Sequence, residues 1–220
     1  MSENMSDKWV DYAVRIQSIA QAGLAYCEDK YGRERYEELR KISAEMISAK
    51  TDIPLEKVYD LFCNESGYQT PKLDTRGAVF IDGKILLVRE NNGTWSLPGG
   101  WCDVDLSVAE NTEKEVLEET GLTLTQYRYC GLVTFVSDIW PTEYMHLFHA
   151  TGFTGTPKDC DEGELAWIGK RQLAALQQWE GDRIFLRLMD EHVPFFSLKL
   201  VYAGNTLMEA VLNGKRLERS

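Results

Sequence analysis

Apolar side chains recur every three or four positions along the first part of the chain. Residues 7–27, 36–46 and 54–62 each carry such a stripe. This spacing is typical of one face of an α-helix, so three helices are expected. The residues that follow are rich in glycine, proline and polar side chains, which is typical of a connecting segment. We therefore expect a small all-helical N-terminal domain at residues 1–66 and a linker at residues 67–75.

These predicted helices are too small to bury much apolar surface on their own. We expect them to pack on a partner subunit or on the rest of the chain, and a homodimer is the expected assembly. A helix-turn-helix reader of DNA is the competing interpretation. It is disfavoured because none of the predicted helices carries a basic face of the kind that contacts DNA.

From residue 76 onward the pattern changes to short apolar runs that are typical of strands. The runs 77–81 and 84–88 are separated by Asp82 and Gly83, a pair that strongly predicts a hairpin. Strands interleaved with helices predict an α+β or α/β/α sandwich fold. The other expected elements are strands at 127–137, 144–151 and 165–168, a late hairpin at 195–202 and 206–211, and helices at 107–120, 170–178 and 182–189.

The helix expected at 107–120 has clear signals at both ends. Ser107 and Glu110 form a capping box, in which each side chain binds a backbone amide of the other residue. Gly121 follows at the position where glycine adopts the left-handed conformation at little cost. These signals predict a helix of about three turns, preceded by a glycine-rich loop.

Three carboxylates, Glu115, Glu118 and Glu119, occupy positions i, i+3 and i+4 of this helix. They share one helix face, where like charges repel by about 0.2–0.5 kcal/mol per pair. Clustered oxygen ligands of this kind suit Mg²⁺ or Mn²⁺, and Mg²⁺ held by carboxylates and substrate phosphates is common in phosphoryl chemistry. A backbone carbonyl of Gly99 or Gly100 would complete the metal site. A solvated acidic helix is the alternative interpretation.

The stretch from Gly100 to Leu122 resembles the Nudix box: a glycine, a spaced glutamate, then Arg-Glu-hydrophobic-x-Glu-Glu-x-Gly-hydrophobic. Lys114 stands at the arginine and Leu106 at the early glutamate, two residues generally read as an ion pair within the box. The scaffold of the box is therefore altered here, while its metal-binding glutamates are retained. The resemblance implies an α/β/α sandwich with a mixed sheet at residues 76–220.

The resemblance also implies a mechanism. Glu115, Glu118 and Glu119 would bind Mg²⁺, with Mn²⁺ as a second suitable ion. The metal would neutralise a diphosphate and lower the pKa of a bound water that attacks phosphorus. A further carboxylate, Glu162 or Glu164, would supply a late metal ligand or a catalytic base. A solvated acidic loop is the alternative interpretation of these last two residues.

The chain is similar to two branches of the family. Residues 1–120 resemble a bacterial branch with a helical N-terminal extension, whose members cleave nucleoside diphosphates linked to another group, such as CDP-choline or ADP-ribose. Residues 121–220 resemble the oxidised-purine nucleoside triphosphatases, most clearly at 179–182 and 194–199. Both a natural divergent member and a chimeric chain joined near 118–122 account for this pattern.

Further residues are also expected to bind the substrate. Arg89 or Lys114 would contact phosphate, and a role for Lys114 in anchoring the box is the alternative interpretation. Trp179 offers an aromatic face for a base, and such stacking is worth about 1–3 kcal/mol. Asp182 would accept hydrogen bonds from a purine edge, and Ser96 stands where the purine triphosphatases often place an asparagine. A core tryptophan at the start of a helix is the alternative interpretation of Trp179.

Three functions remain open at this stage. The preferred one is a Mg²⁺-dependent hydrolase of a nucleoside diphosphate linked to a second moiety, because the N-terminal extension and the glycine-rich loop resemble that branch. The second is an 8-oxo-dGTP diphosphatase, which would release pyrophosphate. The third is a non-catalytic, nucleotide-binding Nudix module. The retained box glutamates count against it, because sensor relatives commonly lose them.

Composition narrows the choice of partners. The formal charge of −11 over 220 residues argues against binding of duplex nucleic acid, which needs basic patches. No apolar run is long enough for a membrane span or typical of a signal peptide. The five cysteines form no Cys-x-x-Cys pair, which favours reduced thiols in a cytoplasmic protein. The expected partner is a small-molecule nucleotide.

Overall fold

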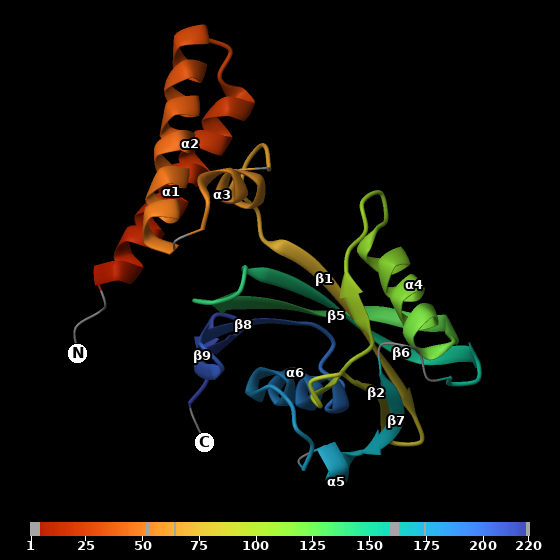
Figure 1. The fold of residues 1–220 in the computed structure, drawn as a ribbon. Helices are drawn as coiled ribbons and strands as arrows, with labels where there is room; N and C mark the ends of the chain where they lie inside the picture. Colours follow the sequence, from red (N-terminus) through yellow and green to blue (C-terminus); the bar gives the residue numbers. More distant parts are fainter. Residues whose placement is uncertain (1–4, 52, 64, 159–162, 174, 219–220) are drawn as a thin grey trace. The chain divides into compact units, whose positions relative to one another are not determined.

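The chain divides into two compact units, Met1–Thr70 and Pro71–Ser220 (Figure 1). The computed structural model describes residues 5–218 except 52, 64, 159–162 and 174. Among the described residues, no helix combines the length and the apolar character that crossing a membrane requires.

The first unit is formed by three helices, as the apolar stripes predict. They are α1 (Met5–Tyr26), α2 (Lys30–Thr51) and α3 (Leu55–Phe62). Its buried apolar cluster comprises Ala44, Val58 and Cys63. Large apolar side chains remain at the surface of this unit: Trp9 is 48% exposed and Ile19 is 61% exposed.

The second unit is built on a mixed sheet, in which β1 pairs parallel to β6 and β5 parallel to β8 while the other pairs are antiparallel. The strand order is β10-β9-β8-β5-β6-β1-β2-β3, with β4 paired to β1 and β7 to β2. The strands are β1 (Lys72–Ile81), β2 (Lys84–Arg89), β3 (Trp95–Ser96), β4 (Gly99–Trp101), β5 (Leu122–Ser137), β6 (Glu143–Gly155), β7 (Glu164–Gly169), β8 (Phe196–Ala203), β9 (Thr206–Leu212) and β10 (Lys215–Arg216).

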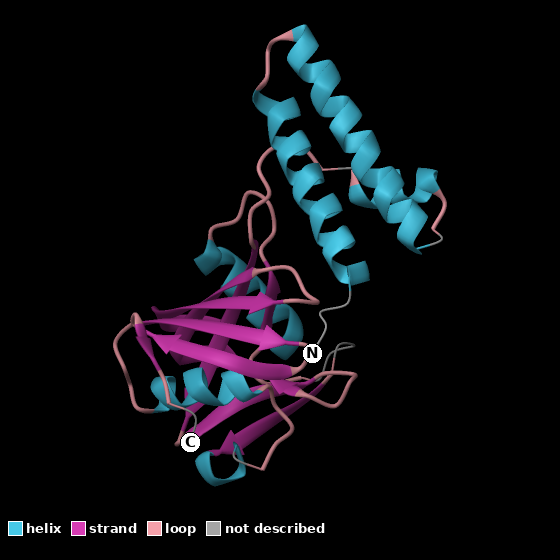
Figure 2. Cartoon of the chain, turned by 90° about the vertical axis from the view of Figure 1, so that its left-hand side faces the viewer, coloured by secondary structure: helices cyan, strands magenta, loops and turns pink. Residues whose placement is uncertain are grey.

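Helices cover both faces of this sheet (Figure 2). They are α4 (Val108–Thr120), the short α5 (Lys170–Leu173) and α6 (Glu180–Asp190). Neighbouring residues of β1 point to opposite faces: Val79 packs with Val116 of α4, whereas Ala78 belongs to the core that includes Phe185 of α6. The expected α+β fold, an α/β/α sandwich behind a helical N-terminal region, is confirmed.

Several element boundaries differ from the expectation: β5 begins at Leu122 and not at 127, for example, and two further differences concern the surroundings of the site. Residues 72–75, expected in the linker, begin β1 because their backbone pairs with β6 and β4. The helix predicted at 170–178 ends at Leu173. After Leu173 the amides of Ala175 and Leu176 donate to carbonyls three residues earlier, not four as in an α-helix. The carbonyl of Gln177 accepts a hydrogen bond of 2.9 Å from the amide of Trp95 in β3.

The ends of α4 follow the prediction. Ser107 is the N-cap of a complete capping box with Glu110, and Gly121 ends the helix at φ 72°. The glutamates between these two ends are therefore held at fixed positions on the surface of the sandwich.

Candidate active site

The glycine bend at the start of β4 is built by the pairing of this strand with β1. Gly99 lies opposite Arg76, and Gly100 lies opposite Thr75. At Gly99 φ is +142°, and a Cβ there would stand 1.9 Å from the carbonyl oxygen of Thr75. Any residue other than glycine would therefore clash with the backbone of β1 and strain its own.

Two of the box carboxylates lie against this bend. Glu119 is 8% exposed, and its Oε2 accepts a hydrogen bond of 3.0 Å from the amide of Gly99. Oε2 of Glu115 lies 2.8 Å from the point that a Cβ on Gly100 would occupy. The space that a side chain would need at Gly100 is therefore taken by a carboxylate.

Lys114 holds together the acidic groups on the outer side of α4. Its Nζ lies 3.0 Å from Oδ2 of Asp103 in the preceding loop. The same atom is 3.1 Å from Oε1 of Glu115 and 3.3 Å from Oε2 of Glu118. Hydrogen bonds to these carboxylates, that to Asp103 first, raise the pKa of Lys114. Asp103 thus supplies the acidic partner that Leu106 cannot supply.

A buried asparagine fixes the loop that carries Asp103. Asn111 of α4 donates hydrogen bonds to Oγ1 of Thr75 at 3.0 Å and to the carbonyl of Trp101 at 3.2 Å. Its Oδ1 accepts from the amide of Asp103 at 2.9 Å. The sequence reasoning missed this residue, although a polar side chain on the inner face of an amphipathic helix is a usable signal.

The box glutamates fit a divalent cation by donor chemistry, because carboxylate oxygens beside a backbone bend are what Mg²⁺ prefers. They do not form a closed cluster. No three His, Cys, Asp or Glu side chains within the described part of the chain lie close enough together to hold a metal ion. The reason is local: Glu115 and Glu118 contact Lys114, whereas Glu119 contacts Gly99.

A pocket of about 240 Å³, here called the tryptophan pocket, opens on the α6 side of the sheet. Ser96, Trp179 and Asp182, three of the expected substrate residues, all line it together with Trp140. Its volume is below the about 300–1,000 Å³ that is usual for drug-sized ligands, so it suits one base or head group. Trp179 also packs edge-on against Tyr202, with ring centroids 5.6 Å apart, so it belongs to the core as well.

Arg76 of β1 lines the tryptophan pocket. Its Nε and Nη2 bind the two carboxylate oxygens of Asp74 at 2.9 and 2.8 Å, and its Nη1 donates to the carbonyl of Leu97 at 3.2 Å. Burial acts to lower the pKa of Arg76, but Asp74, followed by Glu119 and Asp182, raises it overall. The guanidinium therefore interacts with a box glutamate on one side and with a pocket carboxyl on the other.

Asp182 has an unusual protonation equilibrium. Burial raises its pKa to about 7, against the opposing effect of Arg76 and with smaller contributions from Glu90 and Asp74. Close to neutral pH this carboxyl group is therefore part protonated, so it can donate or accept a hydrogen bond. Perturbed carboxyls in a cleft are typical of functional sites.

The remaining expected site residues lie elsewhere. Arg89 does not line the tryptophan pocket. Its Nη1 lies 3.4 Å from Oε2 of Glu164, across the paired strands β2 and β7, and both side chains are exposed. Arg89 thus forms an ion pair at the surface, and its expected contact with phosphate stays a prediction. Glu162 lies outside the described residues.

The sequence reasoning also missed Arg76, Glu90 and Glu143, which line the pocket, and Asp74, which binds Arg76. Asp74 and Arg76 carried a usable signal, since charges at i and i+2 of a strand share one face, here the face that packs under α6. Glu90 and Glu143 gave no such signal, because each stands at a strand end where solvated acids are common. They reach the pocket only through the pairing of distant strands.

Comparisons with known proteins agree with this geometry. A family model described as "NUDIX domain" matches residues 71–189. The chain belongs to the Nudix family. A second model, described as "UDP-X-like, N-terminal oligomerisation domain", matches residues 7–62. The Nudix domain and the pyrophosphatases among the relatives identify the chain as a hydrolase of pyrophosphate bonds.

Both of the expected branches are represented among similar proteins. "Putative ADP-ribose pyrophosphatase YjhB" from Bacillus subtilis is 47% identical over 142 residues, which cover 64% of this chain and 68% of that protein. A match of 142 residues cannot be confined to residues 1–120. An oxidized purine nucleoside triphosphate hydrolase from Danio rerio is 30% identical over 126 residues, covering 54% of this chain and 80% of that protein.

Solved structures agree on the fold. The MutT protein from Bacillus halodurans superposes with a TM-score of 0.61 at 24% identity, covering 64% of this chain and 97% of that one.

Proposed function

We propose that this chain is a Mg²⁺-dependent Nudix pyrophosphohydrolase that cleaves a nucleoside diphosphate linked to a second moiety, of the CDP-choline or ADP-ribose type. The observation that carries the proposal is the contact of Glu115 and Glu119 with the glycine bend, joined through Arg76 to the tryptophan pocket. The name of the Bacillus subtilis relative and the "UDP-X-like" description of the N-terminal model support it.

Each part of the site has a distinct task in this proposal. Glu115, Glu118 and Glu119 would hold the cation beside the glycine bend. When bound, the cation supplies charge neutralisation of the diphosphate and activation of water. Lys114 keeps two of these carboxylates together on the outer face of α4, and no covalent nucleophile is needed.

The tryptophan pocket would hold the base or the terminal group. Glu90, Glu143 and Asp182 line it together with the guanidinium of Arg76. Such a lining repels phosphate and favours a group that carries amino hydrogens or a positive charge. The face of Trp179 adds attraction for either kind of group, through stacking or through a cation–π contact.

A second candidate function is hydrolysis of oxidised purine nucleoside triphosphates such as 8-oxo-dGTP. The specific observation in its favour is that Trp179 and Asp182, the two residues that carry this resemblance, line one pocket. Ser96 lines it as well but departs from the asparagine that is usual in that branch. The similarity to the Danio rerio hydrolase supports the same reading.

The two candidates differ in their products. The full-length chain should be assayed with CDP-choline, ADP-ribose, 8-oxo-dGTP and dGTP, each with Mg²⁺ and with Mn²⁺. We expect the highest kcat/KM for a diphosphate conjugate, which yields a nucleoside monophosphate and a phosphorylated remainder. A higher kcat/KM for 8-oxo-dGTP, with release of pyrophosphate, would support the second candidate instead. Absence of turnover with every compound would favour a binding module.

We also propose that the N-terminal helices form a homodimer interface. The matching model is described as an oligomerisation domain, and the first unit exposes Trp9, Tyr12 and Ile19. Light scattering of the full-length chain should give twice the mass of one chain. A monomer at micromolar concentration would contradict this.

A further inference from the structure

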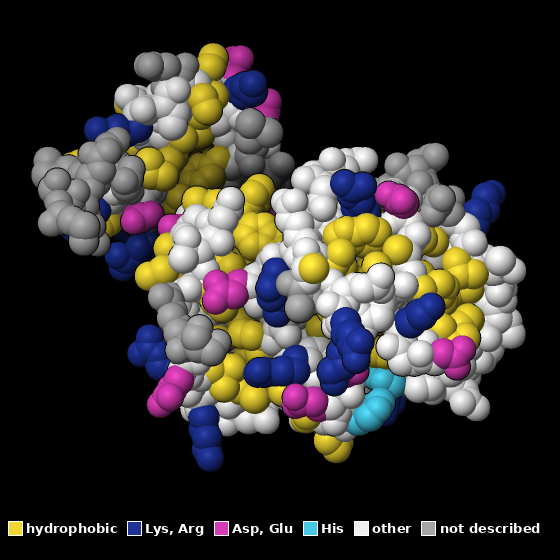
Figure 3. All heavy atoms as spheres, turned by 90° about the horizontal axis from the view of Figure 1, so that it is seen from below, with side chains coloured by type: hydrophobic (Ala, Val, Ile, Leu, Met, Phe, Trp, Pro, Cys, Tyr) yellow, Lys and Arg dark blue, Asp and Glu magenta, His cyan; other side chains and the backbone are white. Residues whose placement is uncertain are grey.

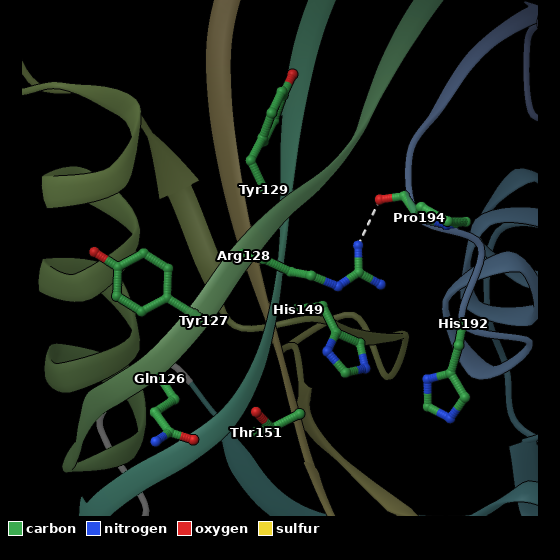
Figure 4. A pocket seen from close by; sticks show the side chains of 8 residues that line it. All are labelled: Gln126, Tyr127, Arg128, Tyr129, His149, Thr151, His192 and Pro194. Carbon is green, nitrogen blue, oxygen red and sulfur yellow. Dashed lines mark hydrogen bonds between the residues drawn. The ribbon is translucent and has the colours of Figure 1, made fainter.

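A second pocket, here called the histidine pocket, has a volume of about 610 Å³ (Figure 4). Arg128 of β5, His149 and Thr151 of β6, and His192 after α6 are among its lining residues. It shares no lining residue with the tryptophan pocket, which lies at the other end of α6. None of its residues takes part in the proposed hydrolysis.

The sheet itself brings the first two of these side chains together. Arg128 and His149 are direct partners in the antiparallel pair of β5 and β6, so both project from the same face. The ring of His149 stacks on Phe80 of β1, with ring centroids 4.6 Å apart and the planes inclined by 23°. The imidazole is thus fixed on one side by an aromatic ring and faces the pocket on the other.

The guanidinium of Arg128 is held in place by the chain after α6. Nη1 donates to the carbonyl of Pro194 at 2.5 Å, and Nη2 lies 3.4 Å from the carbonyl of Val193. An arginine carries five N–H donors, so these two contacts leave others for a ligand. A cation that is already oriented loses little rotamer freedom when it binds.

His149 is a buried group with an unused nitrogen. The residue is 4% exposed, and its Nε2 is buried without a hydrogen-bond partner. Figure 4 shows the ring pointing toward His192, and the two ring centroids are 5.7 Å apart. Burial, then Arg128 and His192, lower the pKa of His149. A buried polar atom without a partner costs free energy unless a ligand or water satisfies it.

The charge of this pocket is opposite to that of the whole chain. Among the described residues that line it, none is an aspartate or a glutamate, although the chain carries a formal charge of −11. Figure 3, a view from below, shows histidine atoms at the surface near Lys or Arg side chains, with Asp or Glu side chains on the same face. A guanidinium, two imidazoles and a hydroxyl without an opposing acid form a set of donors for an anion.

We propose that the histidine pocket is a phosphate-binding site, which takes up either inorganic phosphate or the phosphate group of a small phosphomonoester. Arg128 would bind the anion through its remaining N–H groups, as guanidinium groups do for phosphate. His149 would donate from Nε2 after taking up a proton, and His192 would donate from the opposite side. A pocket of this volume also accommodates the organic part of a phosphomonoester.

A transition metal held between the two imidazoles is the competing occupant. It is disfavoured because Arg128 lies beside His149 and would repel a cation. The described residues that line the pocket also offer no carboxylate as a third ligand.

The test uses the full-length chain in EDTA, titrated with inorganic phosphate, with glycerol 3-phosphate, and, after removal of EDTA, with Zn²⁺. Imidazole NMR signals report directly, because the chain contains three histidines. We expect saturable shifts of the signals of His149 and His192 with a phosphate compound, and tighter binding at pH 6 than at pH 8. The pH effect arises because Nε2 of His149 must take up a proton before it can donate to the anion. Burial and the neighbours Arg128 and His192 lower the pKa of His149, so this proton is lost as pH rises.

Substitutions test which side chains of the histidine pocket bind the anion. Arg128→Gln should weaken phosphate binding by about tenfold or more, because it removes a charged hydrogen-bond donor. His192→Asn should weaken it less, and asparagine tolerates the φ of +57° at this position. Arg171→Gln of α5 is the matched control, since it removes one positive charge outside the pocket and should leave binding unchanged. Thermal unfolding shows that each variant is folded.

The outcomes separate the possibilities. Tighter binding of glycerol 3-phosphate than of inorganic phosphate would identify a phosphomonoester as the ligand, and equal binding would identify the free anion. Equal weakening by Arg128→Gln and Arg171→Gln would overturn the proposal, because it would show unspecific attraction. Saturable shifts with Zn²⁺ and none with phosphate would overturn it in favour of the metal.

Discussion

The box helix α4 and the tryptophan pocket are assembled in opposite ways. The glutamates of α4 lie within one segment of the chain, and capping signals at Ser107 and Gly121 fix the ends of that segment. The pocket instead combines β1, β3, β6 and the start of α6, which are distant in sequence. The candidate metal ligands can therefore be predicted from the spacing of residues in the sequence. The residues expected to select the substrate come together only through strand pairing.

The same contrast appears in the electrostatics. On α4 a half-buried lysine lies within ion-pair distance of the neighbouring carboxylates Glu115 and Glu118. In the pocket, burial dominates and raises the pKa of Asp182 to about 7. Substitutions in the first region should act on turnover, and substitutions in the second should act on substrate binding and pH dependence.

The largest effect is expected on α4. Glu118→Gln should lower kcat by about 100-fold or more, because loss of a metal ligand removes several kcal/mol of transition-state stabilisation. Glu113→Gln on the same helix is the matched control, since Glu113 accepts a hydrogen bond from Tyr127 and stands at a position of the box that the family pattern leaves unspecified. Steady-state assays at saturating Mg²⁺ measure both. Near-normal kcat for Glu118→Gln would exclude this residue from the metal site.

A smaller but still large effect is expected at the glycine bend. Gly99→Ala should lower kcat by about tenfold to 100-fold, because a displacement near 1 Å at the reacting centre has such an effect. It should also lower the unfolding temperature. Gly204→Ala is the control: its φ is also positive, at +55°, but a Cβ there meets nothing within 4 Å. Equal stability and activity of the two variants would show that contact with Thr75 does not matter.

In the tryptophan pocket we expect an effect on KM. Trp179→Ala should raise KM by about tenfold with a small change in kcat, because stacking is worth about 1–3 kcal/mol. Trp179→Phe keeps an aromatic face and should recover most of the affinity. If Trp179→Ala leaves KM unchanged for every nucleotide tested, the ring is a core residue that packs on Tyr202 and no more.

The smallest effect concerns the stability of the fold as a function of pH. The pKa of Asp182 is about 7 in the folded chain and lies near its ordinary value of 3.8 in the unfolded chain. Between these values the folded state retains a proton that the unfolded state loses. The contribution of Asp182 to stability therefore falls as pH rises from about 4 to about 7.

Asp182→Asn removes this dependence. Relative to the wild-type chain, the variant should gain on the order of 2–3 kcal/mol of unfolding free energy between pH 5 and pH 8. Denaturant unfolding at both pH values measures the gain. A constant difference between the two chains would show that the carboxyl of Asp182 does not titrate in this range.

The fold and the box helix were largely predictable, because period, capping and hairpin signals are local properties. The site was predictable in part. The box glutamates, the glycine bend and the residues Ser96, Trp179 and Asp182 were named from their spacing and from the family pattern. Their roles as ligands and substrate contacts stay predictions.

Three features could not be read from local signals. The strand pairing that places Glu90 and Glu143 at the pocket is long-range, and so is the ion pair that occupies Arg89. The helix expected at 170–178 also ends early, at Leu173, and the carbonyl of Gln177 after it accepts a hydrogen bond from the amide of Trp95 in β3. In each case the segment has a partner distant in sequence, which local signals do not reveal.

The contact between Asp103 and Lys114 has a consequence for how members of this family are found. A signature that insists on an acid eight places before the basic residue would discard this chain, although an aspartate from an earlier loop position contacts the same lysine. Searches that specify a carboxylate in space, rather than one at a given alignment column, would recover such sequences.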